Sequence, residues 1–345
     1  MRDPVLLTVL LNYKTPEMTL RSAEAALREM EGIAGKLVIV DNDSQDGSYK
    51  QLLEGAAKHG WDPERVQIVE SGHNGGFGAG NNFGVRHGFK SLSPDFVYFL
   101  NSDAFPDAGA IRKLMAHLET NPKVGIAGSY IHGPDDDPHL TAFRFPSVQG
   151  ELAGAARIGL ISRMFAKHIV AMPIPDQTCP VDWLAGASMM IRREALEQVG
   201  LFDETYFLYY EETDLCLRAR KLGWRTDYVR DSHVTHIGSV STGMKNWTRM
   251  PRYWFDSRQH YFKVNHSLFY AATATLARIT GACMWRVWRV LRRKPKRDPK
   301  FFLIDLVAHT LSHRAVKTRK VPPLTSVQPA FQSESNYDDP VQNLA

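Results

Sequence analysis

Four short polar clusters follow apolar runs in the first third of the chain, and their side chains could bind a nucleotide and a cation. They are Asn12-Tyr13, Asp41-Asn42-Asp43-Ser44, the stretch 71–80 and Asn101-Ser102-Asp103. The Asp41 carboxylate can accept hydrogen bonds from a base or a ribose, and Asp103 beside a diphosphate could hold a hard divalent cation. Any one cluster could be an ordinary turn, because Asn, Asp, Ser and Gly favour turns. Four together favour a binding site.

A glycine-rich segment, His73 to Asn82, leads into a predicted helix. Glycines allow close approach of the backbone, and a helix N-terminus favours phosphate. The dinucleotide-binding fingerprint fails, because Gly78-x-Gly80 would need a third glycine where the chain has Phe83. This argues against an NAD-dependent oxidoreductase. A sugar-phosphate nucleotidyltransferase usually has a glycine-rich basic loop after the first strand, where this chain has Asn12-Tyr13-Lys14-Thr15.

Three carboxylates, Glu211, Glu212 and Asp214, lie around the start of a later helix. Acids in a first turn complement the helix dipole, which is a structural explanation. The catalytic explanation is that one of them is a general base. Adjacent acids point in different directions on a helix, so at most two can face a pocket. Asp214, three residues after Glu211, can help to hold the turn.

Two histidines, His233 and His236, follow a short predicted strand. Residues three apart in an extended segment face opposite sides, so at most one of them faces the site. His236, next to Gly238, is the better candidate.

The elements that position these residues alternate between strand and helix. Short runs rich in Val, Ile, Leu and Phe predict buried strands at Val5–Leu11, Leu37–Val40, Val66–Val69, Phe96–Leu100 and Val124–Ala127. Helices are expected from Thr15-Pro16, after Gly47-Ser48, over Phe77–Gly88 and from Pro106-Asp107, and later over Glu194–Val199 and Glu211–Leu222. This is an α/β fold with a doubly wound, mostly parallel sheet. The four clusters should converge at the carboxyl edge of that sheet.

Length and composition are those of a globular protein. The 345 residues are 43% hydrophobic and 23% charged, which excludes a disordered or collagenous chain. The three cysteines, Cys179, Cys216 and Cys283, form no disulfide framework and fit a reducing compartment. We expect no secretory leader, and no apolar run is long enough for a conventional membrane span.

The basic charge is concentrated near the C-terminus. Residues 278–320 hold thirteen Lys/Arg against two acids, whereas the rest of the chain has 29 basic and 35 acidic residues. From Leu268 to Arg293 the pattern is that of an amphipathic helix with opposed apolar and basic faces. Contact with an anionic membrane through 276–297 is predicted. Packing of the apolar face on the domain or on a second protomer is the alternative, and the acidic body argues against nucleic acid.

The ordered motifs resemble the inverting nucleotide-sugar glycosyltransferases of family 2, over about residues 5–265. The resemblance rests on Asn12-Tyr13, Val40-Asp41-Asn42-x-Ser44-x-Asp46-Gly47, Asn74-x-Gly76-Phe77-x-x-Gly80-x-Asn82, Leu100-Asn101-Ser102-Asp103, Gly200-Leu201-Phe202-Asp203-Glu204, Phe207-x-Tyr209-Tyr210-Glu211-Glu212-Thr213-Asp214 and His236-x-Gly238-x-x-Ser241. The most similar subgroup is the bacterial rhamnosyltransferase-like enzymes. The resemblance implies the GT-A fold, Rossmann-like, with a transferase domain over 1–265 (nucleotide-binding half 1–130, acceptor and catalytic half 131–265). A basic helical extension over 266–322 and a disordered tail over 323–345 are expected to follow.

The resemblance also implies roles for single residues. The nucleotide-binding set would be Asn12, Tyr13, Asp41, Asn42, Asn74, Gly76, Asn82, Asn101 and Ser102. Asp103, the last acid of a D-x-D motif that here reads Asn-Ser-Asp, would hold Mg²⁺ or Mn²⁺, with His236 completing the metal shell. Glu212 matches the catalytic base of a Glu-Asp pair that here reads Glu-Glu, and Glu211 and Asp214 are the alternatives. Trp183 and Gly186 lie in the segment that leads to the acceptor site.

The predicted activity is inverting transfer of a sugar from a nucleoside-diphosphate donor to a hydroxyl of a saccharide or lipid-linked saccharide in bacterial polysaccharide, O-antigen or cell-wall assembly. Rhamnose is the sugar that the subgroup implies. A UDP-sugar donor and a non-catalytic nucleotide-sugar-binding homologue are the alternatives. We expect a cytoplasmic protein, peripheral on the inner face of the plasma membrane, and homo-oligomerisation stays open.

Overall fold

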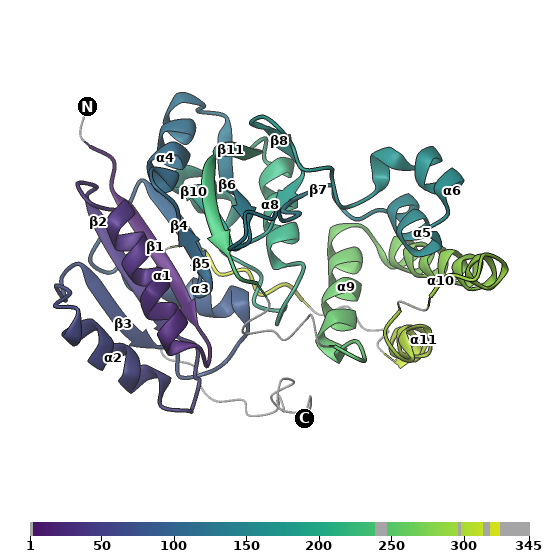
Figure 1. Ribbon diagram of the computed structural model, residues 1–345, viewed down its shortest axis with the longest axis horizontal. Coiled ribbons are helices and arrows are strands. Elements are labelled where there is room, and N and C mark those ends of the chain that lie inside the picture. Colours follow the sequence, from purple (N-terminus) through teal and green to yellow (C-terminus); the bar gives the residue numbers. More distant parts are fainter. Residues whose placement is uncertain (1–2, 239–246, 296–297, 313–317, 325–345) are drawn as a thin grey trace.

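The computed structural model describes residues 3–238, 247–295, 298–312 and 318–324. Within them a nine-stranded sheet has the order β3-β2-β1-β4-β10-β6-β11-β5, and β8 pairs with β11 (Figure 1). The strands are β1 Leu6–Asn12, β2 Gly35–Asp41, β3 Val66–Glu70, β4 Phe96–Asn101, β5 Ala104–Pro106, β6 Val124–His132, β8 Cys179–Val181, β10 Ser188–Arg192 and β11 Arg225–His236. The five strands predicted in the first 130 residues are all present.

The sheet is mostly parallel, as predicted. Strands β3, β2, β1 and β4 pair in parallel, and so do β6 and β11. Strand β10 lies antiparallel between β4 and β6. The alternation of residues along β1 divides the core: Leu6 and Leu10 pack on one side of the sheet, and Leu7 and Val9 on the other. Strands of this kind read as continuous apolar runs because both of their faces are buried.

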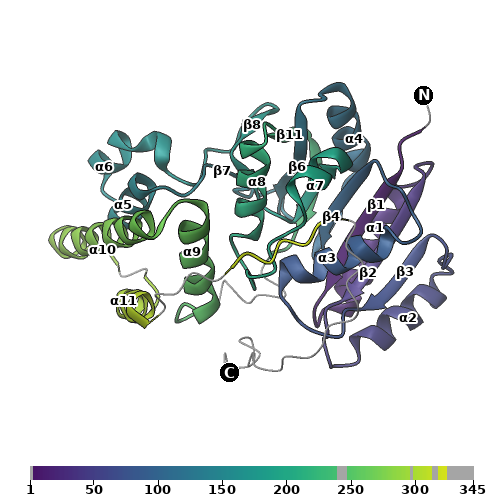
Figure 2. The ribbon, with the colours of Figure 1, turned by 180° about the vertical axis from the view of Figure 1, so that it is seen from behind.

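Helices cover both faces of the sheet (Figures 1 and 2). Their bounds are α1 Pro16–Glu29, α2 Ser48–Lys58, α3 Phe77–Gly88, α4 Ala110–Thr120, α7 Arg193–Val199 and α8 Glu211–Lys221. Side chains of α1, α2 and α4 join the core on one face, and those of α3, α7 and α8 join it on the other. Helix α3 lies especially close to the sheet, because a Cβ at Gly84 or Gly88 would meet Val9 or Leu7 at 2.5 Å.

A second group of helices forms the end of the molecule away from β1–β3 (Figures 1 and 2). It contains α5 Val148–Ala156, α6 Gly159–Met164, α9 Arg252–Asn265, α10 Leu268–Leu291 and α11 Phe302–Ser312, with a short 3-10 helix at Ala166–His168. A two-stranded sheet of β7 Ala142–Phe143 and β9 Trp183–Leu184 lies instead beside the main sheet, where Ala142 and Leu184 pack on Tyr130 and Tyr228. Buried Glu151 on α5 accepts hydrogen bonds from Arg258 on α9 at 2.6 and 3.1 Å and from Arg278 on α10 at 3.3 Å. Arg258 thus packs as an ion-paired core residue.

The predicted amphipathic helix is present as α10. Its packing tests the alternative that the apolar face packs on the domain. The side that packs inward carries small residues and Trp285, whereas Leu276 is 64% exposed and Val287 63%. The apolar face is therefore not packed on the domain, and that reading of the sequence is wrong. No helix in the described ranges is long and apolar enough to cross a bilayer. Residues 296–297 of the predicted segment lie outside the described residues.

The chain returns to the sheet domain after α11. Residues 318–324, which we call the C-terminal strap, run beside the loop 200–205 (yellow in Figures 1 and 2). The Leu201 N–H donates to the Pro322 carbonyl at 3.1 Å, and the Glu204 N–H to that of Lys320 at 2.8 Å. The disordered tail was expected from 323, but Leu324 packs in the core. Residues from 325 onward lie outside the described part.

Candidate active site

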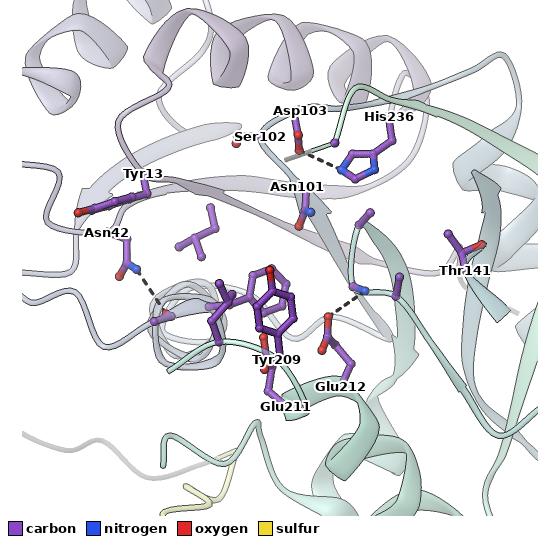
Figure 3. A pocket seen from close by; sticks show the side chains of 18 of the residues that line it. Tyr13, Asn42, Asn101, Ser102, Asp103, Thr141, Tyr209, Glu211, Glu212 and His236 are labelled. Atoms are coloured by element: carbon purple, nitrogen blue, oxygen red, sulfur yellow. Dashed lines mark hydrogen bonds and ion pairs between the residues drawn. The ribbon is translucent and has the colours of Figure 1, made fainter. Parts of the chain in front are cut away.

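A cavity of about 660 Å³ opens at the carboxyl ends of β1, β2 and β4 (Figure 3). Its walls include residues of both halves of the sheet. The polar and aromatic residues that line it are Tyr13, Asn42, Asn74, Phe77, Asn101, Ser102, Asp103, His139, Thr141, Phe207, Tyr209, Glu211, Glu212, His236 and Tyr253. This volume suits a ligand of the size of a nucleotide sugar.

The four polar clusters converge here, as the parallel strand order predicts. Tyr13, Asn42, Asn74 and the Asn101-Ser102-Asp103 turn each contribute to the wall. The Asn42 side-chain amide donates to the Asn74 Oδ1 at 2.9 Å and to the Gly76 carbonyl at 3.3 Å. This contact joins the end of β2 to the glycine-rich segment before α3.

Three of the nucleotide-binding candidates do not reach the cavity. Asn12 and Asn82 are fully buried, and Asp41 is 1% exposed. The Asn12 Nδ2 and the Ser44 Oγ each donate to the Asp41 Oδ1 at 2.6 Å. Asn82 donates to the Phe202 carbonyl at 2.9 Å and to Glu204 at 3.0 Å. These side chains hold strand ends and loops together behind the wall, which corrects the expectation that they touch the ligand.

Gly76 allows the loop before α8, in the second half of the chain, to pack against the glycine-rich segment in the first half. It has φ +88°, and a Cβ there would lie 1.8 Å from the Phe207 carbonyl oxygen. The Phe77 N–H donates to the same oxygen at 3.0 Å. Glycine at this position therefore brings the segment that carries Tyr209 and the acid pair onto the start of α3.

Asp103 and His236 form a pair on one side of the cavity (Figure 3). The His236 Nε2 lies 3.1 Å from the Asp103 Oδ1. His233 points elsewhere, with its ring against Tyr130, as the spacing of the two histidines predicts. Among the described residues, no group of three His, Cys, Asp or Glu side chains could enclose a metal ion. Asp103 and His236 are two donors of the kind that an incomplete, substrate-completed cation site needs.

Glu211 and Glu212 lie on the other side of the cavity, at the start of α8 (Figure 3). The Glu212 Oε1 accepts a hydrogen bond from the Gly186 N–H at 3.0 Å. Glu211 is buried, and its Oε2 has no hydrogen-bond partner among the residues that the structure describes. Burial raises the pKa of both carboxyls, and the charge of Glu212 raises the pKa of Glu211 further. Of the two carboxyls, Glu211 has the more strongly raised pKa, and Glu212 is the one that a backbone N–H stabilises.

Two residues before the acid pair adopt an unusual backbone conformation. Tyr209 and Tyr210 have φ of 69° and 73°, although neither is glycine. Such conformations cost about 1–3 kcal/mol each and persist where the surroundings impose them, often at functional sites. The turn aims Tyr209 into the cavity and leaves Tyr210 as the N-cap of α8.

Asp214 does not belong to the cavity wall. It is fully buried, and its carboxylate accepts hydrogen bonds from Arg218 at 2.7 Å, Asn265 at 2.6 Å and Arg319 at 2.8 Å. With this set of partners it stabilises the base of the helix turn. The suggestion that Asp214 is a catalytic acid or base is corrected by its place.

Trp183 is likewise a packing residue. Its ring stacks on Phe143 at 4.2 Å, and its Nε1 donates to the Arg144 carbonyl at 2.9 Å. Because the ring lies outside the cavity wall, the structure does not offer it to an acceptor sugar. Gly186, from the same segment, does line the cavity.

The wall also contains residues of the second half for which the sequence predicted no role, among them His139, Thr141 and Phe207. His139 approaches His236, with ring centroids 6.1 Å apart. The segment 131–180 lacks regular periodicity, so no pattern marked 138–141 as part of a site. Phe207 stands in the motif before the acid pair, which is the one signal that could have found it.

The whole cavity and the sheet around it fall within one family match. A family model described as glycosyltransferase like family 2 matches residues 4–274. The chain belongs to this family. It is therefore a glycosyltransferase, and the readings as an oxidoreductase or a nucleotidyltransferase fall away.

Curated relatives of this glycosyltransferase include enzymes for rhamnose and other hexoses. The N-acetylglucosaminyl-diphospho-decaprenol L-rhamnosyltransferase of Mycobacterium tuberculosis is 27% identical over 215 residues, 60% of this chain and 68% of the relative. The low-salt glycan biosynthesis hexosyltransferase Agl10 of Haloferax volcanii is 30% identical over 214 residues, 62% of this chain and 61% of the relative. The rhamnosyltransferase WbbL of Escherichia coli is 26% identical over 164 residues, 47% of this chain and 60% of the relative.

Solved structures confirm the predicted GT-A fold. The mannosyltransferase PcManGT of Pyrobaculum calidifontis, in complex with GDP-Man and Mn²⁺, has a TM-score of 0.52 at 16% identity and covers 90% of this chain and 81% of its own. GalNAc-T7 with UDP, GalNAc and Mn²⁺ has a TM-score of 0.57 at 12% identity. The match covers 90% of this chain and 58% of the GalNAc-T7 chain.

Proposed function

We propose that this glycosyltransferase moves a sugar from a nucleoside-diphosphate donor to a hydroxyl of a saccharide or lipid-linked saccharide, with inversion at the anomeric carbon. The observation that carries the proposal is the opposition of Asp103 and His236 to Glu211 and Glu212 across one cavity. Cation ligands on one wall suit a departing diphosphate. A carboxylate on the other wall suits an attacking hydroxyl.

The nucleoside would lie along the first-half wall. Tyr13 offers an aromatic ring, and Asn74, whose Oδ1 is held by Asn42, offers the N–H groups of its side-chain amide. These groups can stack on a base and form hydrogen bonds with it. The diphosphate would then extend toward Asn101, Ser102 and Asp103.

The donor set of this wall fits a divalent cation. Asp103 supplies a carboxylate and His236 an imidazole, and cations of this class commonly take their remaining ligands from water and substrate phosphates. The ion would be Mg²⁺ or Mn²⁺, since carboxylate and water ligands suit both. When bound, the ion would supply Lewis-acid stabilisation of the charge that develops on the leaving diphosphate.

Glu212 would be the general base. The Gly186 N–H stabilises its carboxylate, and burial together with the charge of Glu212 raises the pKa of the neighbouring Glu211. Glu212 would accept the proton of the acceptor hydroxyl as the oxygen attacks the anomeric carbon from the side opposite the diphosphate. Attack from that side inverts the configuration. Tyr209 and Tyr253 would border the acceptor.

The donor is proposed to be dTDP-rhamnose, because relatives from Mycobacterium tuberculosis and Escherichia coli are named rhamnosyltransferases and one from Shigella flexneri is named dTDP-rhamnosyl transferase RfbF. A panel of dTDP-, UDP- and GDP-sugars, each with Mn²⁺, Mg²⁺ or chelator, tests this by thermal stabilisation and donor hydrolysis. Metal-dependent response to dTDP-rhamnose alone is expected. A response to a UDP-sugar would replace the donor, and binding without any turnover on acceptors would indicate a non-catalytic homologue.

We also propose peripheral contact with an anionic membrane on its cytoplasmic side, through 276–297 and the helices beside it. All but three of the exposed large apolar side chains of the described residues lie on or beside α6, α10 and α11: Leu160, Met164, Leu268, Phe269, Leu276, Met284, Val287, Val290, Leu291, Phe301, Ile304, Val307 and Leu311. Exposed Arg286, Arg292 and Arg293 lie on or directly after α10. Apolar side chains next to basic ones suit an anionic lipid interface. We further propose that the transferase domain ends at residue 265 and that the helical extension begins at 266. Helix α5 then packs as part of that extension.

Flotation with phosphatidylglycerol vesicles tests the membrane contact. The triple variant Val287→Ser, Val290→Ser, Leu291→Ser is expected to lose flotation, and Leu53→Ser, an exposed leucine on α2, is the matched control. Equal flotation of both would contradict the proposal. A dimer that the triple variant dissociates would assign the surface to a second copy of the chain.

A further inference from the structure

The C-terminal strap packs along the loop 200–205, which precedes the acid pair Glu211–Glu212. Asp203 in that loop accepts hydrogen bonds from the Lys320 N–H at 2.9 Å, the Thr205 N–H at 3.0 Å and the His260 ring at 2.9 Å. Burial alone would raise the pKa of Asp203, but these hydrogen bonds bring it to about 2. The contacts of the loop with Pro322 and Lys320 extend this attachment along the strap.

Arg319 extends from the strap to the first turn of α8. Its Nη2 donates to the Asp214 Oδ1 at 2.8 Å and to the Asn265 Oδ1 on α9 at 2.5 Å. The Asp214 N–H closes the turn by donating to the Tyr210 carbonyl at 2.8 Å. Arg319 therefore holds the turn that carries Glu211 and Glu212 from the side away from the cavity.

Arg319 shares Asp214 with other partners. Arg218 binds the second carboxylate oxygen of Asp214 at 2.7 Å and also donates to the carbonyls of Val199 and Leu201, so it ties α8 to the loop after α7. Asn265 is a further cross-element partner, and Arg319 bonds it as well. The cavity side is fixed through Gly186 and Glu212. Arg319 is the contact by which the side chain of the strap joins Asp214 and α9.

We propose that Arg319 is a positioning residue for the reaction: through Asp214 it sets the orientation of the first turn of α8, and so the place of the Glu211–Glu212 pair. This inference rests on the proposed function, because it needs the pair to act on an acceptor. It predicts that loss of Arg319 slows turnover while donor binding, which uses the opposite wall, stays unchanged.

The test compares Arg319→Ala, Arg319→Lys and the control Lys320→Ala in the full-length protein. Lys320 has an exposed side chain, and its hydrogen bonds to the described residues are all made by its main chain, so its variant removes an equal charge one residue away. Arg319→Ala should lower kcat by about 10- to 100-fold, because small displacements of a reacting group have effects of this size. The donor Kd should stay within about twofold, Arg319→Lys should recover part of kcat, and Lys320→Ala should match the wild type.

Two further readouts keep the test decisive. A double-mutant cycle with Asp214→Asn should be non-additive in kcat, because both changes remove one contact. Hydrogen exchange of the amides of 211–218 should be faster in Arg319→Ala, a result that needs no substrate and therefore stands even if the wild type transfers no sugar. Wild-type kcat in a folded Arg319→Ala, unchanged exchange, or an equal loss in Lys320→Ala would overturn the proposal.

Discussion

The carboxylate of Glu212 is held by the backbone of Gly186, whose N–H donates to Oε1 at 3.0 Å. Gly186 lies just before β10, the strand that runs against its neighbours β4 and β6. Because β10 runs antiparallel, its N-terminal end lies at the cavity edge, where the parallel strands have their C-terminal ends. The Gly186 N–H, just before β10, therefore also lies at this edge. A hydrogen-bond donor is thereby aimed at the side chain that we propose as the base.

Gly186→Ala should therefore lower activity through crowding. An added Cβ would lie 2.7 Å from the Glu212 Oε1 and 3.0 Å from the Phe77 ring, so the carboxylate must move. We expect kcat to fall by about 10- to 100-fold with little change in donor Kd. The matched control is Gly154→Ala on α5, where a Cβ meets nothing within 4 Å. Normal turnover of Gly186→Ala would show that this contact does not orient the reacting group.

Glu212→Gln should abolish most turnover and keep donor binding. General base catalysis contributes about 10²–10⁴-fold, so a loss of that size in kcat is expected. Burial raises the pKa of Glu212, and a base must be ionised to act, so wild-type kcat should fall with decreasing pH at values above the ordinary range of a glutamate. Steady-state kinetics between pH 5 and pH 9 measure both effects. Turnover near that of the wild type in Glu212→Gln would remove Glu212 from the role.

Glu211→Gln should change how stability depends on pH. The folded state raises the pKa of Glu211, so above the unfolded value of about 4.3 the folded state holds a proton that the unfolded state has released. The free energy of unfolding therefore falls as pH rises through this window, and the glutamine removes that fall. Urea unfolding at several pH values measures the slope. A slope identical in both proteins would mean that Glu211 ionises without cost in the fold.

Asp103→Ala should remove the response of donor binding to Mn²⁺. His236→Ala should weaken that response by at least about tenfold, because loss of a direct ligand costs no less than loss of an outer-shell partner, which costs about 10–100-fold. Calorimetric titration of the donor with and without Mn²⁺ gives the two values. His233→Ala, on the same strand but outside the cavity wall, is the control. An unchanged metal response in Asp103→Ala would place the cation elsewhere.

Arg258→Ala should destabilise the helical end of the molecule without a direct effect on donor affinity. It leaves buried Glu151 with a single partner, Arg278 at 3.3 Å, and breaking a buried pair costs about 3–5 kcal/mol. Denaturant unfolding measures the loss, and donor Kd below the melting transition measures the site. A donor Kd that rises in parallel with the instability would contradict this separation.

Much of the fold was predictable because its signals are local. Strands β1 to β4 are apolar runs bounded by turn residues, and α3 begins and ends at the predicted residues Phe77 and Gly88. Parallel order then brings Asn42, Asn74 and Asp103 to one edge without further information. The family motifs pointed to the acid pair for the same reason: it occupies one helix turn.

What the sequence could not give depends on distant contacts. Asp214 and Glu212 are both carboxylates and lie two residues apart, and distant partners such as Asn265 and Arg319 identify Asp214 as the structural one. Trp183 could have stacked on a sugar until Phe143 was seen against its ring. The sequence also does not indicate the direction of β10, because a short apolar strand buries the same side chains in either direction.

The antiparallel strand β10 limits how enzymes with this fold can recombine segments of their sequences. Ser188 pairs with Leu100 of β4, and Met189 with Gly128 of β6, so residues before and after position 130 are interleaved in one sheet. A hybrid joined at that position would have to fit a foreign strand between two resident ones. New specificities should therefore arise by changes in edge loops such as 138–141 and 207–209 more readily than by recombination of halves.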